Sequence, residues 1–196
     1  MKHAMRVITL TVLLMIAFGA AAGQNNQQPN TAIANRYSNI SLGFRYAPPS
    51  GMRDKTLRFP ALQIQNPSRA SGTPQTLATL LAMSSGPDSS VPDWCSVTIV
   101  TYPRNAVSET DDTKAAGQMN AWVAHSKDTS VSPTPVVFSG QSFTVSVFGL
   151  QEGTLKKSAV VFTTIRKGKL LSFAFAANSS ERLSVLTDTM KSVEFY

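Results

Sequence analysis

The run VVFTTIRKGKLLSFAF, residues 160–175, restricts the fold more than any other segment, because a short basic turn separates two apolar stretches of similar length. If Lys167 and Gly168 form a two-residue turn, Gly168 supplies the positive φ that such turns need, and Arg166 pairs with Lys169. Counting back from the turn predicts three further pairs on one face: Phe162 with Phe173, Val160 with Phe175 and Thr164 with Leu171. The other face mixes branched and small residues, so we expect helices or loops to cover both faces.

Other segments also carry strand signals. Residues 75–85 (QTLATLLAMSS) and 93–103 (DWCSVTIVTYP) are bounded by turn signals, and the second alternates regularly. Short strands are predicted at Tyr37 and 44–46 around a turn with Gly43, and on both sides of a turn at 139–140. Between residues 53 and 69, Leu57, Phe59, Leu62 and Ile64 favour short strand segments interrupted at Pro60.

Two segments have the helical period. Residues 111–126 repeat apolar side chains at helical spacing after an acidic cap, which predicts a first helix. The segment after residue 177 predicts a second helix, capped by Asn178 or Ser179 and with Glu181 placed as in a capping box. Its apolar stripe should lie across a sheet face. The sequence VEF at 193–195 is expected to close the domain as a short strand.

The chain begins as a secretory signal peptide does. Lys2 and Arg6 precede an apolar stretch and small residues, so we expect a signal peptide over 1–22 with cleavage after Ala22. A permanent anchor is the alternative, although about a dozen apolar residues fall short of the roughly 20 that span a bilayer. Residues 23–35 form a polar leader, and 36–196 form one domain. The predicted protein is bacterial, exported, and periplasmic or extracellular.

The chain carries a formal net charge of +7, which falls to +5 when Lys2 and Arg6 are removed with the signal peptide (7 − 2 = 5). This excess favours anionic partners such as envelope lipid, acidic polysaccharide or acidic protein. Nucleic acid is not an expected partner outside the cytoplasm.

The basic residues form two groups in the sequence. The candidate site for an anionic partner consists of Lys156, Lys157, Arg166, Lys167 and Lys169. A second group lies in the first part of the domain: Arg36, Arg45, Arg53, Lys55, Arg58 and Arg69. The alternative interpretation is that lysines at turns and strand ends keep the protein soluble and block edge pairing.

No motif predicts a catalytic, cofactor-binding or metal-binding residue. His125 has no metal ligands at suitable spacing, and the segment SGQSF at 139–143 lacks the second glycine of a nucleophile elbow. Asp111 and Asp112 are adjacent, so they suit a helix cap better than a pair flanking a substrate. Phosphate-binding glycine motifs are absent from the sequence. Cys95 is the single cysteine, which excludes an intrachain disulfide, and its flanks predict a half-buried thiol in a strand.

Three pieces of the sequence resemble the PsbP-like family. They are the opening YSNISLGFRYAPPSGM, the middle helix, and the close VVFTTIRKGKLLSFAFAANSSERLSVLTDTMKSVEF. The resemblance covers residues 37–195, with Met52 where relatives place a tryptophan. It implies an α+β fold in which helices flank an antiparallel sheet, an α-β-α sandwich. It also implies a role in binding or assisting protein complexes without known catalysis, and no active site.

These observations favour an exported, non-catalytic accessory or binding protein whose ligand the sequence does not identify. Two alternatives stay open. One is a secreted hydrolase with a dispersed serine or carboxylate site, and the other is a binder of anionic envelope surfaces that works through the basic groups.

Overall fold

The computed structural model describes residues 36–59, 61–64, 75–86, 93–126, 132, 135–152 and 155–196. The predicted signal peptide (1–22), the predicted leader (23–35) and Arg69 lie outside the described residues. No helix within the described ranges is both long and apolar enough to cross a bilayer.

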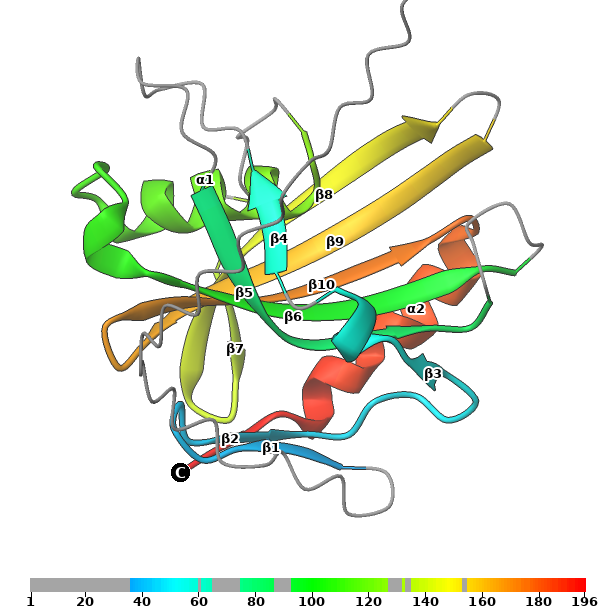
Figure 1. The fold of residues 1–196 in the computed structure, drawn as a ribbon, viewed down its shortest axis with the longest axis horizontal. Helices are drawn as coiled ribbons and strands as arrows, with labels where there is room; N and C mark the ends of the chain where they lie inside the picture. The colour runs from blue at the N-terminus through cyan, green and yellow to red at the C-terminus, as the bar shows by residue number, and fades with distance from the viewer. Residues whose placement is uncertain are drawn as a thin grey trace, which may run out of the picture.

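Most of the strands form one large antiparallel sheet (Figure 1). Its strand order is β3-β5-β6-β10-β9-β8-β7, and β4 also pairs with β5. The strands are β3 (Arg53–Asp54), β4 (Ala61–Ile64), β5 (Gln75–Ser84), β6 (Cys95–Pro103), β7 (Val136–Phe138), β8 (Gln141–Glu152), β9 (Leu155–Arg166) and β10 (Lys169–Ala177). The strands expected at 75–85 and 93–103 are confirmed as β5 and β6.

The β9–β10 hairpin has the predicted register. Arg166 pairs with Lys169, and the pairs Thr164–Leu171, Phe162–Phe173 and Val160–Phe175 follow. Lys167 and Gly168 both have positive φ, +48° and +73°, which is the geometry of a type I′ turn. The turn expected at 139–140 has the same geometry and joins β7 to β8.

Three short strands form a second antiparallel sheet: β1 (Tyr37–Asn39), β2 (Phe44–Tyr46) and β11 (Glu194–Phe195). β2 lies in the centre and pairs with both neighbours, so the first and last parts of the domain meet here. Phe44 and Tyr46 are fully buried and point at Phe173 of β10, with ring centroids 5.5 and 5.9 Å apart. The predicted strands at Tyr37, 44–46 and VEF are therefore confirmed.

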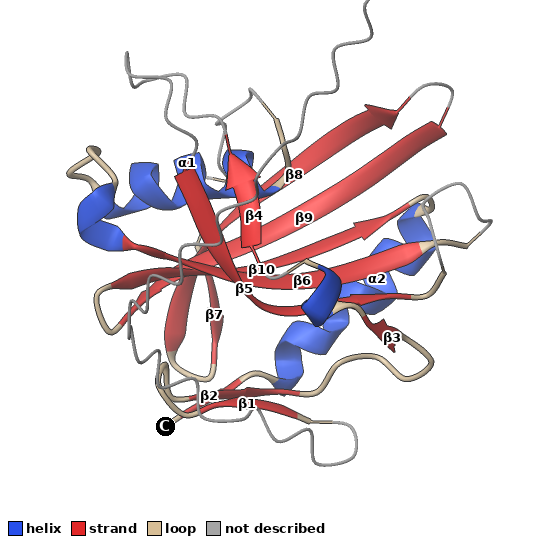
Figure 2. Cartoon of the chain, viewed as in Figure 1, coloured by secondary structure: helices blue, strands red, loops and turns tan. Residues whose placement is uncertain are grey.

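The described residues form two α-helices and three short 3₁₀ helices (Figure 2). They are α1 (Asp112–Val123), α2 (Ser180–Asp188), η1 (Thr56–Arg58), η2 (Arg104–Ala106) and η3 (Thr189–Ser192). Asp111 caps α1 by accepting from the Lys114 amide. Ser179 caps α2 in the same way through the Arg182 amide, so Glu181 falls one position short of a capping box.

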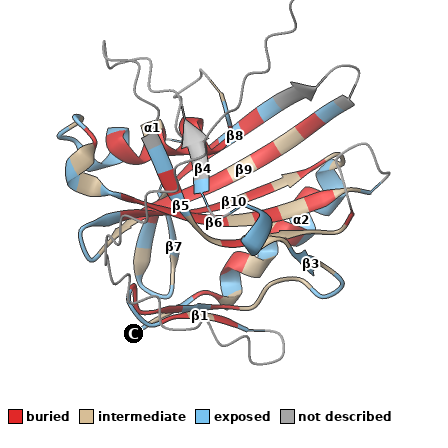
Figure 3. Ribbon diagram, viewed as in Figure 1, coloured by how far each residue is buried: buried red, intermediate tan, exposed pale blue. Residues whose placement is uncertain are grey.

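Each face of the large sheet carries its own apolar core (Figure 3). α1 packs on one face over small residues such as Ala159 and over Val161 and Leu170. The other face presents Phe162, Phe173 and Phe175 to α2, η3 and the three-stranded sheet. Both faces of the hairpin are covered, as the alternation of its side chains predicts.

The predicted α-β-α sandwich, with helices flanking one sheet, is wrong. The described chain is mostly antiparallel strand in two sheets; α1 covers one face of the large sheet, whereas α2 shares the other face with the second sheet. On the aromatic face a second sheet takes the place of a helical layer. The physical reason is that β11 follows α2 and η3 almost directly and pairs with β2, which buries Phe44 fully and Phe195 in part.

The expectation for residues 53–69 is also wrong in part. Residues 56–58 form η1, and Leu57 is 96% exposed, so Leu57 and Phe59 do not belong to a strand. β4 begins after residue 60 and pairs with β5, as expected for a strand segment following Pro60.

Candidate functional site

The five residues of the candidate basic site lie at two ends of one strand. Lys156 and Lys157 stand near the start of β9, whereas Arg166 is its last residue. Lys157 and Arg166 are nine residue steps apart along the strand, which is about 30 Å at roughly 3.3 Å per residue. Lys157 is buried and its Nζ lies 5.3 Å from the centre of the Trp94 ring. The structure thus groups Arg166, Lys167 and Lys169 and separates them from the other two.

Arg166 connects the hairpin to the second sheet. Its Nε donates to the carbonyl oxygen of Leu42 over 3.1 Å, and its Nη2 donates to the main-chain oxygen of Tyr196 over 2.8 Å. The guanidinium also lies over the Phe195 ring, 5.3 Å from its centre. These contacts hold the turn before β2 and the residues after β11 against the hairpin.

The tip of the hairpin stands beside cations from the other sequence group. Arg45 of β2 lies over the Tyr196 ring at 5.2 Å, and the same Tyr196 accepts from Arg166. Lys167 and Lys169 are exposed and make no ion pair within the described ranges. We define the basic corner as Arg45, Arg166, Lys167 and Lys169.

Two exposed apolar side chains belong to the segments that Arg166 holds. Ile40, in the turn between β1 and β2, is 65% exposed, and Tyr196 is 54% exposed. Arg36 also reaches this region, but its Nη1 lies 3.7 Å from Glu194 in an exposed ion pair. Such a surface pair contributes little to stability. The corner therefore combines Lys167 and Lys169, two exposed lysines without an ion pair in the described ranges, with exposed apolar groups.

Three other basic residues of the second group lie elsewhere. Arg53 belongs to β3, Lys55 precedes η1, and Arg58 is the last residue of η1. These residues lie beside β5, at the other edge of the large sheet. The second group is therefore split between the basic corner, which contains Arg45, and the β3–β5 edge of the large sheet.

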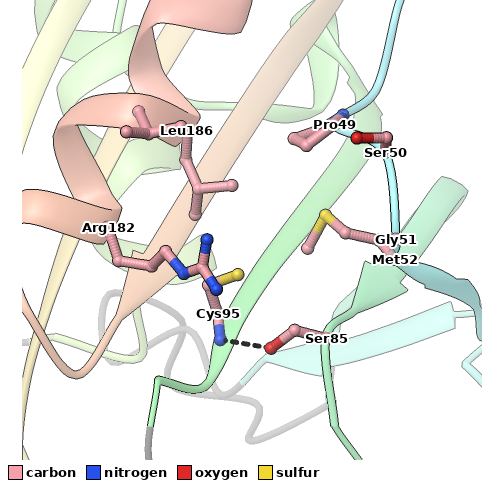
Figure 4. A pocket seen from close by; sticks show the side chains of 9 residues that line it. Pro49, Ser50, Gly51, Met52, Ser85, Cys95, Arg182 and Leu186 are labelled. Atoms are coloured by element: carbon pink, nitrogen blue, oxygen red, sulfur yellow. Dashed lines mark hydrogen bonds between the residues drawn. The ribbon is translucent and has the colours of Figure 1, made fainter.

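A pocket of about 270 Å³ lies between α2 and the loop that follows β2 (Figure 4). Met52 approaches from the loop, and Arg182 and Leu186 approach from α2. The start of β6 lies across its inner end, where the Cys95 amide donates to Ser85 Oγ over 2.9 Å. We call this site the α2 pocket; its lining is Pro49, Ser50, Gly51, Met52, Ser85, Cys95, Arg182, Val185 and Leu186.

The residues that sequence analysis considered for chemistry have structural roles here. Asp111 caps α1, and Asp112 accepts from Arg104 Nε over 2.9 Å. His125 is exposed just beyond the end of α1 and has a φ of +52°, the left-handed conformation common after a helix. Within the described part of the chain, no three histidine, cysteine, aspartate or glutamate side chains gather as metal ligands.

A buried polar network lies between α1 and the large sheet. Asn120 of α1 is fully buried, donates to Ser146 Oγ over 2.9 Å, and accepts from Thr163 Oγ1. Since the Thr163 proton is used in that bond, Ser172 must donate to Thr163. Every polar atom of this network has a partner, so its two serines position α1 on the sheet and are not candidate nucleophiles.

Burial strongly raises the pKa of one tyrosine, Tyr46. Loss of hydration raises the pKa of Tyr46 well above its ordinary value, and the hydrogen bond to Thr189 offsets this only in part. Thr189 Oγ1 donates to the Leu186 carbonyl, so Tyr46 is the donor in the 2.7 Å bond between the two hydroxyls. The phenol therefore ties the second sheet to the end of α2.

No protein-family model matches the chain, and no curated protein matches it. Similar solved structures include a crystal structure from Bacteroides thetaiotaomicron VPI-5482, with 10% identity, 83% of this chain covered and a TM-score of 0.43. That match covers 48% of the Bacteroides chain, so the present chain spans about half of its length. A solution structure of cyanobacterial PsbP (CyanoP) from Synechocystis sp. PCC 6803 has 16% identity and a TM-score of 0.46, with 89% of this chain and 100% of that chain covered.

At these identities and TM-scores, the two similarities assign neither a family nor a function to this chain. Membership of the PsbP-like family stays a prediction from the sequence.

Neither the α2 pocket nor the position of Arg182 in its lining was predicted from the sequence. The pocket joins residues from α2, β6 and the loop at 49–52, which are far apart in the chain. No motif or spacing marks such a site, because it exists only once the second sheet has packed beside α2.

Proposed function

We propose that the protein is an exported, non-catalytic accessory protein that binds an anionic lipid surface of the bacterial envelope through the basic corner. The observation that carries this proposal is that Arg45 of β2 and Arg166 of β9 both contact Tyr196, while the exposed Lys167 and Lys169 lie in and beside the turn that follows Arg166. A binding role is also what the sequence resemblance to the PsbP-like family implies.

The arrangement of the corner favours a lipid surface over an acidic protein or polysaccharide. Lys167 and Lys169 are exposed in and beside a tight turn, and Ile40 and Tyr196 expose apolar surface on the segments next to it. Peripheral membrane proteins combine cations for the headgroups with apolar side chains for the interface. Each lysine near an anionic membrane contributes about 1 kcal/mol to binding.

A secreted hydrolase remains the competing function. Its site would need a serine or carboxylate next to a general base. Ser85 lines the α2 pocket, but its hydroxyl bonds to main-chain groups of Cys95 and Asp93. That arrangement supports a structural role for Ser85, and so favours binding over hydrolysis.

The test is sedimentation of the mature protein with vesicles that contain phosphatidylglycerol, compared with neutral phosphatidylcholine vesicles. We expect binding to the anionic vesicles alone, weakening as salt rises because screening shortens the range of the charges. The double variant Lys167→Glu/Lys169→Glu should bind at least about 30-fold more weakly, from about 1 kcal/mol lost per lysine.

The matched control is Lys114→Glu/Lys156→Glu, which changes the net charge equally at two exposed positions away from the corner. It should bind the anionic vesicles nearly as well as the unmodified protein. Equal loss in both double variants would show that net charge alone drives binding. Binding to acidic polysaccharide but not to vesicles, or hydrolase activity abolished by one serine substitution, would replace the proposal.

A further inference from the structure

The α2 pocket has an apolar wall and a cationic rim. Met52, Leu186 and Pro49 supply the apolar surface, and the Cys95 thiol lies at the inner end. Arg182, an exposed residue of α2, lines the same pocket (Figure 4). An apolar pocket with few polar groups at fixed places is the usual form of a small-molecule site.

The guanidinium of Arg182 makes no stabilising polar contact within the described residues. The Arg182 amide bonds to Ser179, but its side chain has no hydrogen bond or ion pair with any residue in the described ranges. This contrasts with Arg104 and Arg166, whose guanidinium groups bind carbonyl or carboxylate oxygens of the protein. Arg182 therefore keeps its planar set of donors for a carboxylate, which it can bind through two parallel bonds.

The residues that line the pocket restrict the chemical class of ligand that it can bind. None of the nine lining residues is acidic, so nothing there would pair with the ammonium group of an amino acid. The hydroxyls of Ser50 and Ser85 supply hydrogen-bonding groups without charge. A volume of about 270 Å³ lies just below the usual range of pockets for drug-sized ligands, which favours a small ligand.

We propose that the α2 pocket binds a short aliphatic monocarboxylate, with Arg182 holding the carboxylate and Met52 and Leu186 contacting the alkyl chain. The site is separate from the basic corner and does not depend on membrane binding. Cys95 is a contact at the inner end of the pocket and takes no part in any covalent step.

Cys95 also provides a reporter, because it is the single cysteine of the chain. We expect hexanoate to slow alkylation of Cys95 by iodoacetamide by at least about threefold near saturation, whereas hexanamide, the neutral analogue of equal shape, should not. Such small ligands bind weakly, with a Kd near 1 mM, so titration should extend to about twenty times that concentration. Hexanamide protecting as well as hexanoate would overturn the role of the carboxylate.

A second measurement covers the case in which Cys95 reacts too slowly to report. Methyl NMR resonances of Met52 and Leu186 should shift on adding hexanoate, and the absence of a shift at the highest concentration would overturn the proposal. Arg182→Gln should weaken binding about tenfold in either assay, since a charged pair of hydrogen bonds is lost. The matched control Arg58→Gln removes an exposed arginine from η1 and should leave hexanoate binding unchanged; equal weakening in both variants would reject Arg182 as the carboxylate ligand.

Discussion

At the scale of single residues, Arg166 holds three segments together with one side chain. It donates to the carbonyl oxygens of Leu42 and Tyr196 and stacks on Phe195, while it is itself the last residue of β9. Its neighbour Lys167 is exposed and bonds to nothing in the described part of the chain. Two adjacent cations thus have different functions, and charge alone does not distinguish them.

This difference predicts different effects on stability. Arg166→Gln should lower the free energy of unfolding by about 1–2 kcal/mol, because two bonds from a charged donor to carbonyl oxygens are lost. Lys167→Gln should change it by less than about 0.5 kcal/mol, as expected for an exposed position without partners. Urea denaturation of both variants measures the difference, and equal stability of the two would contradict the structural role of Arg166.

At the scale of elements, the turn before β2 and the residue after β11 form a close contact. The Tyr196 amide donates to the Gly43 carbonyl over 2.9 Å, and Gly43 has a φ of +65°. A Cβ at position 43 would collide with the main-chain oxygen of Tyr196. Glycine is required here both for its conformation and for the space it leaves.

A matched pair of substitutions separates those two requirements. Gly140→Ala, in the β7–β8 turn, meets the same positive φ (+74°) with no atom near the new Cβ, so it should cost about 1 kcal/mol. Gly43→Ala should cost about 1–3 kcal/mol more, because Tyr196 must also move. Thermal unfolding of both variants tests this, and equal melting temperatures would mean that the contact at Tyr196 adds nothing.

At the scale of the whole molecule, Phe173 connects the two sheets. Its ring contacts Phe44 and Tyr46 of the small sheet and Phe143 of β8, in edge-to-face geometry. Tyr46 adds a hydrogen bond to Thr189, so the small sheet, the large sheet and the end of α2 share one core. We therefore expect these parts to unfold together.

The burial of Tyr37 and Tyr46 predicts that the protein loses stability at alkaline pH. The pKa values of Tyr46 and Tyr37 are raised in the folded protein, chiefly by burial, so the unfolded chain loses these protons first as pH rises above about 10. Their contribution to stability is complete below that pH and is lost above it, by up to about 1.4 kcal/mol per pH unit for each tyrosine. Urea midpoints between about pH 8 and 11 measure the loss. Tyr46→Phe should flatten the curve, and an unchanged slope would show that Tyr46 is not responsible.

The local structure of this protein follows from its amino-acid sequence. The β9–β10 register, the turns at Gly43, Gly140 and Gly168, and both helices follow from side-chain alternation, positive-φ positions and caps, all of which act between residues close in the chain. The exception was η1, where Leu57 resembled a strand residue but is exposed.

Long-range packing, in contrast, sets which elements share a layer and which charges share a surface. It placed a second sheet where a helical layer was expected, separated Lys157 from Arg166, brought Arg45 beside the hairpin, and placed Arg182 in the lining of a pocket with Met52. The physical reason is that β2 and β11, nearly the whole domain apart in sequence, pair because this packs their aromatic side chains, Phe44 fully buried and Phe195 partly buried, against the large sheet. The spacing of residues along the chain does not indicate that β2 pairs with β11, so neither the basic corner nor the α2 pocket could be predicted from it.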